Sequence, residues 1–572
     1  MKVLPLSRVR TRQLAHALAL GVLPLVAACA RTDEPGGRAP EDRGGAPWFE
    51  EEARERGLVF EHRSGHGERH WMPEIMGGGA ALLDADGDGD LDAYLVQGGS
   101  LTPDAPAWRN HLFLNDGAGR FRDEPEAGGT APGGAPPRYG MGVACGDSDG
   151  DGDTDLYLTH VGPNALYENT GGRFGDATGD APATDGWSTS AAFFDYDRDG
   201  ALDLFVARYL EWSKTAELAC TDPLGRPDYC SPKNYKTPAR SLLFHNQGAG
   251  RFADVSRQSG VAGSAGNGLG VACGDLDGDG WLDVFVANDG TPNHLWRNLA
   301  DGRFEEVAML AGSGTDSNGT AKAGMGIALA DLDDDLDLDV LVCNLAGESD
   351  SFFRNEGGYF SDRTGALALA SISKPFTRFG VALGDFDQDG RIDLFEANGR
   401  VERQRVPAEG DPYAEPNLLM RGSAEGRFEE VLPRGGTRVL VMATSRAVAQ
   451  GDLDGDGALD LLIVNRDGPA HLLMNRTPGR GHALLLRVLE KCGADALGAV
   501  LEIDLGQRKV RRDVTAAFGY LASHDPRVHL GLGAAERVES VLVRWADGAA
   551  ERYGPLESGR VHELKRGLGT RP

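Results

Sequence analysis

The chain has 572 residues and a formal net charge of −29 at pH 7, from 58 basic and 87 acidic side chains. Hydrophobic residues make up 41% of it, which excludes wholesale disorder, and glycine is unusually frequent at 81 residues. So acidic a chain excludes sequence-independent nucleic-acid binding, because that activity depends on Lys and Arg neutralising phosphates. The charge fits either cations as partners or a soluble outer surface.

The first 28 residues read as a targeting segment. Four basic side chains precede an apolar run over residues 14–28 that is short for a membrane span. The run ends in small residues before Cys29, a pattern that resembles the bacterial lipobox and implies a lipoprotein signal peptide at 1–28 with lipidation of Cys29. A plain signal peptide with an incidental cysteine is the alternative. Residues 29–47 have no apolar pattern, which favours a flexible tether.

Because no other stretch is long enough to cross a bilayer, we expect membrane attachment by lipid only. The expected location is that of an exported bacterial lipoprotein, at the outer membrane or cell surface. Export permits disulfides. Cys220 and Cys230 lie in one polar, Pro-containing insertion and are expected to pair, whereas Cys145, Cys273 and Cys343 follow apolar residues and are expected to be buried thiols.

One nine-residue phrase, Asp-x-Asp-x-Asp-Gly-x-x-Asp, recurs seven times at intervals of 48 to 80 residues. Loop positions 1, 3, 5 and 9 are Asp in every copy, and position 6 is Gly in all but the fifth, where Leu336 stands. The candidate metal ligands are Asp84, Asp86, Asp88 and Asp92; Asp147, Asp149, Asp151 and Asp155; Asp195, Asp197, Asp199 and Asp203; Asp275, Asp277, Asp279 and Asp283; Asp331, Asp333, Asp335 and Asp339; Asp385, Asp387, Asp389 and Asp393; and Asp452, Asp454, Asp456 and Asp460.

These loops predict calcium sites, up to seven in number. Calcium takes six to eight oxygen ligands, and alternate carboxylates in a tight loop converge on one centre. Position 7 varies between Asp, Ala, Trp and Arg, as expected for a residue that offers its backbone carbonyl. The loops are not EF-hands, because position 12 is apolar in six copies; the exception, Glu396, is expected to face solvent or to add a ligand. Leu336 makes the fifth site the least secure of the seven.

The sequence around each loop predicts strands. Small apolar residues precede each loop, β-formers follow it, and the unit continues with an apolar-Asn-Gly phrase and a Phe-x-acidic phrase. Six Phe phrases follow loops, while the seventh, Phe49-Glu50-Glu51, stands before the first loop. A ring whose first strand completes its last blade needs such an exchange, and an open solenoid, the alternative, does not. Residues 48–480 are therefore predicted to form a seven-bladed β-propeller.

The repeats resemble the FG-GAP/VCBS family of integrin-α-like propellers, most clearly from Phe379-Gly380 through Asp393, and the resemblance implies calcium on the four Asp of each loop. Residues 481–572 alternate apolar runs with turns and predict a small β-sandwich domain. Their series 518–523, 528–533 and 543–548 resembles the ASPIC/UnbV domain of cartilage-acidic-protein-like proteins. The predicted fold class is thus all-β, a propeller followed by a small sandwich.

No catalytic motif stands out. His62, His66 and His70 have helical metal-site spacing, but the glycines between them argue against a helix. Tyr520 and Trp545 suggest either a binding face or, preferably, packing in the small β core. We expect a non-enzymatic, calcium-stabilised surface lipoprotein with a protein or glycan ligand at the propeller face. The alternative is a secreted carbohydrate-active enzyme, such as a calcium-bearing propeller polysaccharide lyase, or a glycan-capturing accessory lipoprotein.

Overall fold

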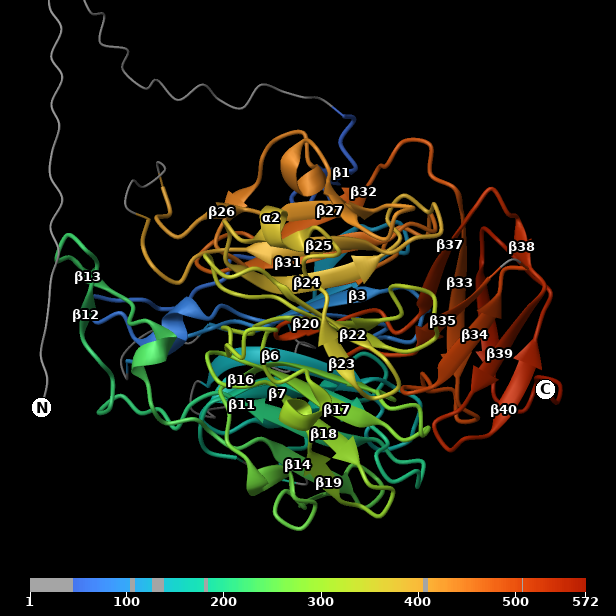
Figure 1. Ribbon diagram of the computed structural model, residues 1–572, viewed down its shortest axis with the longest axis horizontal. Helices are drawn as coiled ribbons and strands as arrows, with labels where there is room; N and C mark the ends of the chain where they lie inside the picture. Colours follow the sequence, from blue (N-terminus) through green and yellow to red (C-terminus); the bar gives the residue numbers. More distant parts are fainter. Residues whose placement is uncertain (1–44, 103–107, 126–137, 180–183, 405–409, 507) are drawn as a thin grey trace, which may run out of the picture. The chain divides into compact units, whose positions relative to one another are not determined.

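The computed structural model describes residues 45–102, 108–125, 138–179, 184–404, 410–506 and 508–572. The predicted signal peptide, Cys29 and most of the tether lie outside the described residues. Nearly all regular structure is strand, which confirms the all-β prediction (Figure 1). The described helices are short: α1 (Ala308–Ala311), α2 (Leu369–Ser373) and the 3-10 turns η1 (Met72–Ile75), η2 (Pro232–Asn234), η3 (Val261–Gly263) and η4 (Arg434–Gly436). None of the described helices is long and apolar enough to cross a membrane.

Each Asp loop joins the first and second strands of one antiparallel sheet, and the described residues contain seven such sheets. The first strands are β2 (Ala80–Leu83), β6 (Tyr139–Gly146), β10 (Ser188–Phe194), β16 (Gly268–Gly274), β20 (Ile327–Ala330), β24 (Arg378–Gly384) and β30 (Ser445–Gly451). The second strands are β3 (Asp92–Leu95), β7 (Asp155–Val161), β11 (Asp203–Arg208), β17 (Asp283–Asn288), β21 (Asp339–Val342), β25 (Asp393–Asn398) and β31 (Asp460–Asn465). Every second strand therefore begins at the Asp of loop position 9.

The third and fourth strands form the outer half of each sheet. The third strands are β4 (His111–Asn115), β8 (Ala165–Asn169), β14 (Leu242–Asn246), β18 (His294–Asn298), β22 (Ser351–Asn355), β27 (Leu418–Gly422) and β32 (His471–Asn475). The fourth strands carry the Phe phrases: β5 (Phe121–Asp123), β9 (Phe174–Asp176), β15 (Phe252–Asp254), β19 (Phe304–Glu306), β23 (Phe360–Asp362), β28 (Phe428–Glu430) and, for the seventh sheet, β1 (Phe49–Glu51).

The sheets close into a ring. Each first strand contacts the first strand of the next sheet, and β30 of the seventh contacts β2 of the first. The predicted exchange of ends is present, since β1 pairs with β32 in the register Phe49↔Asn475. Phe49 is fully buried, and its ring packs edge-on against Phe386 at 5.6 Å and Phe395 at 6.3 Å between ring centroids. The exchange gives β32 a partner on its outer edge, so the seventh sheet has four strands like the others.

The last ninety residues form two further sheets, drawn in orange to red in Figure 1. One sheet has the order β37 (Val528–Gly533), β33 (His482–Leu489), β42 (Val561–Lys565); the other has the order β35 (Lys509–Asp513), β34 (Val500–Asp504), β39 (Ser540–Arg544), β40 (Ala550–Tyr553). A short pair joins β38 (Arg537–Val538) to β41 (Leu556–Glu557). Side chains of both sheets share one apolar cluster around the fully buried Trp545, as in a small sandwich.

One segment of this C-terminal domain leaves it and enters the ring. Within residues 518–525, here called the channel segment, β36 (Ala522–Ser523) pairs in parallel with β2. Gly519 exchanges backbone hydrogen bonds with Ile327 of β20, and the Leu521 N–H donates to Ser190 Oγ of β10 at 3.0 Å. The buried Tyr520 hydroxyl donates to the carbonyl of Met76 at 3.1 Å.

The remaining first strands also reach the channel segment. A Cβ on Gly142 of β6 would lie 3.2 Å from Leu521 Cα, and one on Gly270 of β16 would lie 2.8 Å from the Gly519 carbonyl oxygen, so both positions need glycine for this close approach. Tyr520 packs on Phe379 of β24, and Asp525 donates its N–H to Gln450 of β30. The channel segment thus contacts all seven first strands and fills the centre of the ring.

Candidate metal centres

The loop backbone explains why glycine recurs in the repeats. Position 6 has φ between +73° and +101° in every loop, including Leu336 at +73°. Position 4 is also left-handed in every loop, and Arg198, Asp334 and Gln388 adopt it without glycine. Position 4 was not singled out from the sequence, although Gly occupies it in four of the seven copies. The strained fifth loop is held by the same contacts as the others, since Leu336 donates its N–H to Asp331.

The Asp of position 1 organises the loop around itself. In the second loop, Asp147 accepts the N–H groups of Gly150 at 2.8 Å and Gly152 at 3.0 Å. The third and seventh loops differ, because one oxygen of Asp195 and one of Asp452 are buried and have no hydrogen-bond partner. A buried carboxylate oxygen without a donor is costly, so both loops have capacity for a cation.

The Asp of position 9 ties the loop to the third strand. One of its oxygens accepts the N–H of position 2, and the other accepts the N–H of the last residue of the third strand, in all seven loops. Asp460, for example, accepts from Leu453 at 3.0 Å and Asn475 at 2.7 Å and is fully buried. Burial raises the pKa of Asp92, Asp155 and Asp339 to about 7.

Carboxylate oxygens lie close together within several of the loops. Ligand oxygens lie within 4.8 Å of one another in Asp84, Asp86 and Asp88, in Asp147, Asp149 and Asp155, and in Asp195, Asp197 and Asp199. Burial, followed by the charge of Asp151, raises the pKa of Asp149. These sets of hard oxygen donors fit calcium, which the loops would bind through positions 1, 3, 5 and 9 and the carbonyl of position 7.

Asparagine side chains link neighbouring loops around the ring. The Asn that ends a third strand donates its Nδ2 to the position 2 carbonyl of the loop in the preceding sheet, as Asn169 does to Ala85 at 2.8 Å and Asn475 to Phe386 at 2.9 Å. Six sheets carry this Asn, and Gly422 stands in its place in the sixth. The fifth loop, which already lacks the position 6 glycine, therefore also lacks this link.

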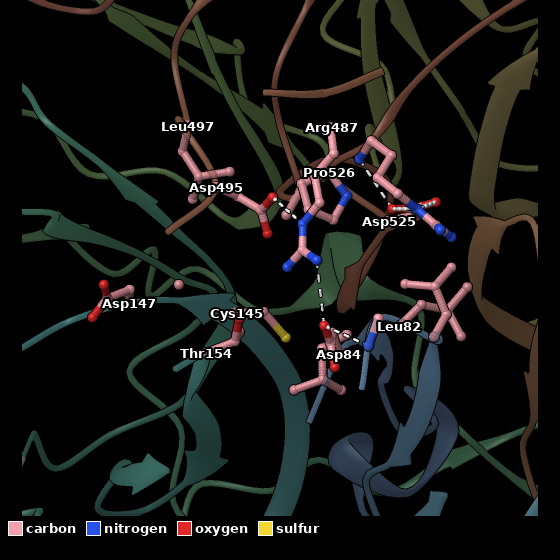
Figure 2. Close-up of a pocket in the computed structure, with 16 residues that line it drawn as sticks. Leu82, Asp84, Cys145, Asp147, Thr154, Arg487, Asp495, Leu497, Asp525 and Pro526 are labelled. Atoms are coloured by element: carbon pink, nitrogen blue, oxygen red, sulfur yellow. Dashed lines mark hydrogen bonds and ion pairs between the residues drawn. The ribbon is translucent and has the colours of Figure 1, made fainter. Parts of the chain in front are cut away.

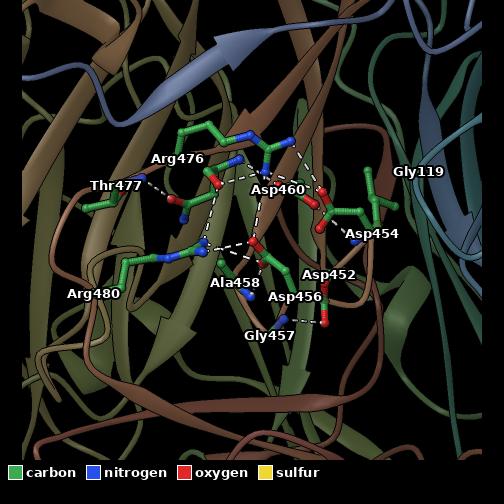
Figure 3. Close-up of polar contacts among 12 residues, drawn as sticks. Gly119, Asp452, Asp454, Asp456, Gly457, Ala458, Asp460, Arg476, Thr477 and Arg480 are labelled. Carbon is green, nitrogen blue, oxygen red and sulfur yellow. Dashed lines mark hydrogen bonds and ion pairs between the residues drawn. The ribbon is translucent and has the colours of Figure 1, made fainter.

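Arginines of the ring lie on several of the loops. Arg297 contacts Asp277 at 3.2 Å, Arg354 contacts Asp333 at 2.7 Å, and Arg421 contacts Asp387 at 2.7 Å. In the seventh loop Arg476 reaches Asp454 at 3.3 Å and Arg480 reaches Asp456 at 2.8 Å (Figure 3). These side chains were not among the candidate residues from the sequence, although three of them occupy the same place in the repeat.

The C-terminal domain adds further arginines. Arg487 lies between Asp495 and Asp84 with both contacts at 3.4 Å, beside a cavity of about 40 Å³ (Figure 2). Arg508 contacts Asp334 at 2.5 Å, Arg511 donates to the Leu336 carbonyl at 3.1 Å, and Arg527 donates to the Asp452 carbonyl at 3.1 Å. This domain therefore lies against the loop end of the ring.

Two expectations from the sequence were wrong. Glu396 does not face solvent: it is fully buried in β25, near Cys343 Sγ at 3.8 Å, and burial holds its pKa well above the usual range. Arg378, buried beside it, contacts Asp350 at 2.8 Å, which compensates part of the buried negative charge. Tyr520 does not pack in the small β core, because the channel segment carries it into the ring.

The predicted disulfide Cys220–Cys230 is present. It staples an insertion between β11 and β14 that contains β12 (Cys220–Thr221) and β13 (Pro227–Asp228). Asp228 accepts the Tyr413 hydroxyl at 2.5 Å and the Arg403 N–H at 3.0 Å, so the insertion reaches the connection that follows β25. That connection also holds β26 (Glu415–Pro416), which pairs with β29 (Met442–Ala443).

A groove of about 680 Å³ lies between the insertion and residues 400–404. Its lining includes Asp222, Asn234, Glu402, Arg403 and Gln404. One wall is the connection that follows β11, and the other is the connection that follows β25. Each of these second strands begins at its Asp loop, so both connections start at the opposite end of the sheet. The groove therefore lies at the other end of the ring from the C-terminal domain.

The remaining candidates have structural roles. His62 is fully buried, and burial lowers its pKa to about 4. His66 contacts Asp467 at 3.1 Å and His70 packs on Tyr229, and the segment that carries the three is not helical. Cys145 and Cys343 are buried as predicted, and Cys273 is half-buried.

A closed ring of seven sheets, each with an Asp loop between its first two strands, together with a small sandwich, defines a β-propeller with a repeated Asp loop. The FG-GAP-like repeat family profile matches residues 84–158, 147–206, 225–286, 275–342 and 331–396, together about half of the chain. The ASPIC and UnbV profile matches residues 490–571. The chain belongs to the FG-GAP-like repeat proteins and carries an ASPIC and UnbV domain.

Curated relatives align with most of this chain. Cartilage acidic protein 1 of Mus musculus is 27% identical over 496 residues, which cover 82% of this chain and 61% of the relative. The Xenopus tropicalis protein of that name is 26% identical over 505 residues, covering 83% of this chain and 71% of the relative. The chain thus spans about 61% of the length of the mouse relative.

Solved structures resemble the ring only distantly. A structure of an Agrocybe aegerita lectin that recognises non-reducing terminal N-acetylglucosamine covers 64% of this chain and 88% of its own at 16% identity, with a TM-score of 0.38. YCF48 bound to a D1 peptide covers 73% of this chain and 98% of its own at 10% identity, with a TM-score of 0.39. Likenesses at this level say nothing about the ligand of this chain.

Proposed function

We propose that this protein is a calcium-stabilised binding protein whose seven Asp loops hold structural calcium. The observation that carries the proposal is the convergence of three carboxylates within 4.8 Å in loops whose backbone is fixed by their own hydrogen bonds. Without a cation, such a cluster combines desolvation with mutual repulsion, and both raise the pKa of Asp149. A divalent cation removes both costs at once.

The stabilisation expected from calcium follows from linkage. An ion that binds the folded state alone contributes RT ln(1 + [L]/Kd) per site, about 2.7 kcal/mol at 100 times its dissociation constant. Extracellular calcium modules have dissociation constants of about 10⁻⁴–10⁻³ M, so millimolar calcium adds roughly 1 kcal/mol at each site. Several such sites would raise the melting temperature by many degrees.

The test is thermal unfolding of the protein in calcium, in magnesium and in EDTA. We expect a higher melting temperature in calcium than in EDTA, and a smaller shift in magnesium, which demands stricter octahedral geometry. Asp149→Asn, inside the second loop, is expected to reduce the calcium shift. The matched control is Asp301→Asn, in an exposed turn where Asp301 pairs with Arg303. An unchanged transition in EDTA would refute the proposal.

We further propose that the ligand, a protein or a glycan, binds the groove between the disulfide-stapled insertion and residues 400–404. Two facts support this placement: the channel segment fills the ring centre, and the groove is lined by carboxylate, amide and guanidinium groups that suit a polar ligand. Arrays of glycans and of peptides are suitable probes, with Gln404→Ala as the groove variant and Arg251→Ala, on a distant turn, as control. Retention without cleavage supports a binding protein, whereas cleaved products would indicate the lyase alternative.

We also propose that Cys29 is lipidated and anchors the protein at the bacterial surface. The support is the sequence pattern before Cys29, a basic segment followed by a short apolar run and small residues. Metabolic labelling with a fatty acid analogue in a bacterial host tests it. Label is expected on the wild type and not on Cys29→Ser; equal labelling of both would contradict the anchor.

A further inference from the structure

The seven loops differ at one structurally equivalent place, the next-to-last residue of the third strand. Its register is the same in each sheet, since it is always paired with the middle residue of the fourth strand, as His245 is with Ala253 and Arg297 with Glu305. The residue at this place is here called the overlying residue, and in the third to sixth sheets its side chain contacts a carboxylate of the loop. In loop order the overlying residues are Leu114, Glu168, His245, Arg297, Arg354, Arg421 and Met474.

Where the overlying residue is Arg, its guanidinium contacts the carboxylate of position 3, and in two of the three loops also that of position 5. Arg354 contacts Asp333 at 2.7 Å and Asp335 at 3.3 Å. Arg421 contacts Asp387 at 2.7 Å and Asp389 at 2.6 Å. Arg297 contacts position 3 of the fourth loop, Asp277, at 3.2 Å. These loops already contain a positive charge supplied by the chain.

In the seventh loop arginines also contact the carboxylates, but neither of them is the overlying residue. Its overlying residue is Met474, but Arg476 and Arg480, just beyond the third strand, contact Asp454 and Asp456 (Figure 3). One oxygen of the buried Asp452 and one of Asp454 still have no hydrogen-bond partner. The arginines therefore cover the outer oxygens of the cluster and leave inner oxygens available to an ion.

The first two loops are different. Among the described residues, no cationic side chain lies within 4 Å of the position 3 and 5 carboxylates of the first loop, whose only ion pair joins Asp84 to Arg487. No ion pair between described residues reaches any of the four Asp of the second loop, and its overlying residue is Glu168 where the fourth to sixth loops have Arg. Both loops also keep glycine at positions 4 and 6.

We infer that six of the seven loops form two affinity classes, set by whether the described chain places its own arginine on the position 3 and 5 carboxylates: the first and second loops bind calcium tightly, and the fourth to seventh bind it weakly. This inference rests on the proposed calcium function and extends it. Repulsion between a guanidinium and a calcium ion about 5 Å away lowers the association constant by about tenfold even at the dielectric constant of water. A positive charge in place also lowers the need for an ion, because it offsets part of the repulsion between the carboxylates.

Calcium stoichiometry tests the inference directly. The EDTA-stripped full chain is titrated with calcium and the bound ions are counted by native mass spectrometry. We expect about two ions at low calcium and more only at about tenfold higher concentration. Arg297→Leu and Arg421→Leu are each expected to add one ion to the tight class, and Leu114→Arg is expected to remove one.

The fourth loop contains its own spectroscopic reporter. Trp281 occupies position 7, so a terbium ion bound there is expected to show tryptophan-sensitised emission. Arg297→Leu or the more conservative Arg297→Gln should raise the terbium affinity measured by this emission by about tenfold. Arg297→Lys, which keeps the charge, and Arg303→Leu, whose partner Asp301 lies outside the loop, should leave it unchanged.

The outcomes separate the two claims. If no ion binds at millimolar calcium, the proposed calcium function fails, and the inference with it. If calcium binds with one affinity at all loops, or if Arg297→Leu and Arg297→Gln both behave like Arg303→Leu, the calcium function stands and the two affinity classes are refuted. Two tight ions that increase in number with each arginine removed would establish the inference.

Discussion

Replacing Phe49 by Ala should open the ring. Phe49 is fully buried against Phe386 and Phe395, and truncating a buried Phe to Ala typically costs about 3–5 kcal/mol. The matched control is Phe428→Ala, the same position of the sixth sheet, where Phe428 is also buried. Both variants lose a similar side chain, but β28 follows β27 in a hairpin, whereas β1 is held to β32 across more than four hundred residues of chain.

The distinguishing measurement is hydrogen exchange in β32, combined with urea unfolding. Loss of Phe49 should release β1 and expose the edge of β32, so the amides of Leu472 and Arg476, which donate to Glu51 and Trp48, should exchange faster at a urea concentration well below the midpoint. Phe428→Ala should leave these amides protected while lowering the midpoint by a comparable amount. A Phe49→Ala protein that loses less than about 1 kcal/mol, or keeps β32 fully protected, would refute closure by exchanged ends.

Three further outcomes are expected. Leu336→Gly should raise the free energy of unfolding by about 1 kcal/mol in urea titration, because glycine relieves the left-handed backbone at φ +73°; a loss of stability would show that the Leu336 side chain matters more than its backbone. Burial raises the pKa of Glu74 from 4.5 to about 8, so the folded state holds this proton more tightly than the unfolded state and loses stability as the pH rises from about 4.5 to 8. Glu74→Gln should remove this part of the pH dependence of the melting temperature. The same dependence of melting temperature on pH in both proteins would contradict this reasoning. Asn169→Ala should cost about 1–3 kcal/mol and reduce the calcium-dependent shift of the first loop, whose Ala85 carbonyl it binds, while Asn318→Ala, on an exposed turn, should change neither.

The repeat made most of the ring predictable from the sequence. Seven copies of one loop fix the turns, the flanking β-formers fix the strands, and the misplaced Phe phrase at residue 49 indicates closure. The Asn links and the overlying arginines were also readable, because they recur at one place in the repeat. They were missed because each lies in the third strand, more than ten residues from the loop that it serves.

The features outside the repeat were not predictable. The channel segment looked like part of the C-terminal sandwich, and nothing in its pattern indicates that Tyr520 binds the carbonyl of Met76. Glu396 was assigned to solvent because a single carboxylate in a strand is usually exposed. Its burial depends on Arg378 and Asp350, which come from neighbouring parts of two sheets and have no fixed spacing in sequence.

The exchanged ends also set an order of events during synthesis. β1 is synthesised before every other described strand, yet its partner β32 follows more than four hundred residues later. Throughout that interval an edge strand bearing Phe49 has no native partner, which is a hazard for pairing with other chains. The acidic pair Glu50 and Glu51 on the same strand would discourage such pairing by charge repulsion. During translation β1 therefore stays without its native partner, and the charges of Glu50 and Glu51 disfavour pairing with other chains. The ring can close only after the strands of the seventh sheet have been synthesised.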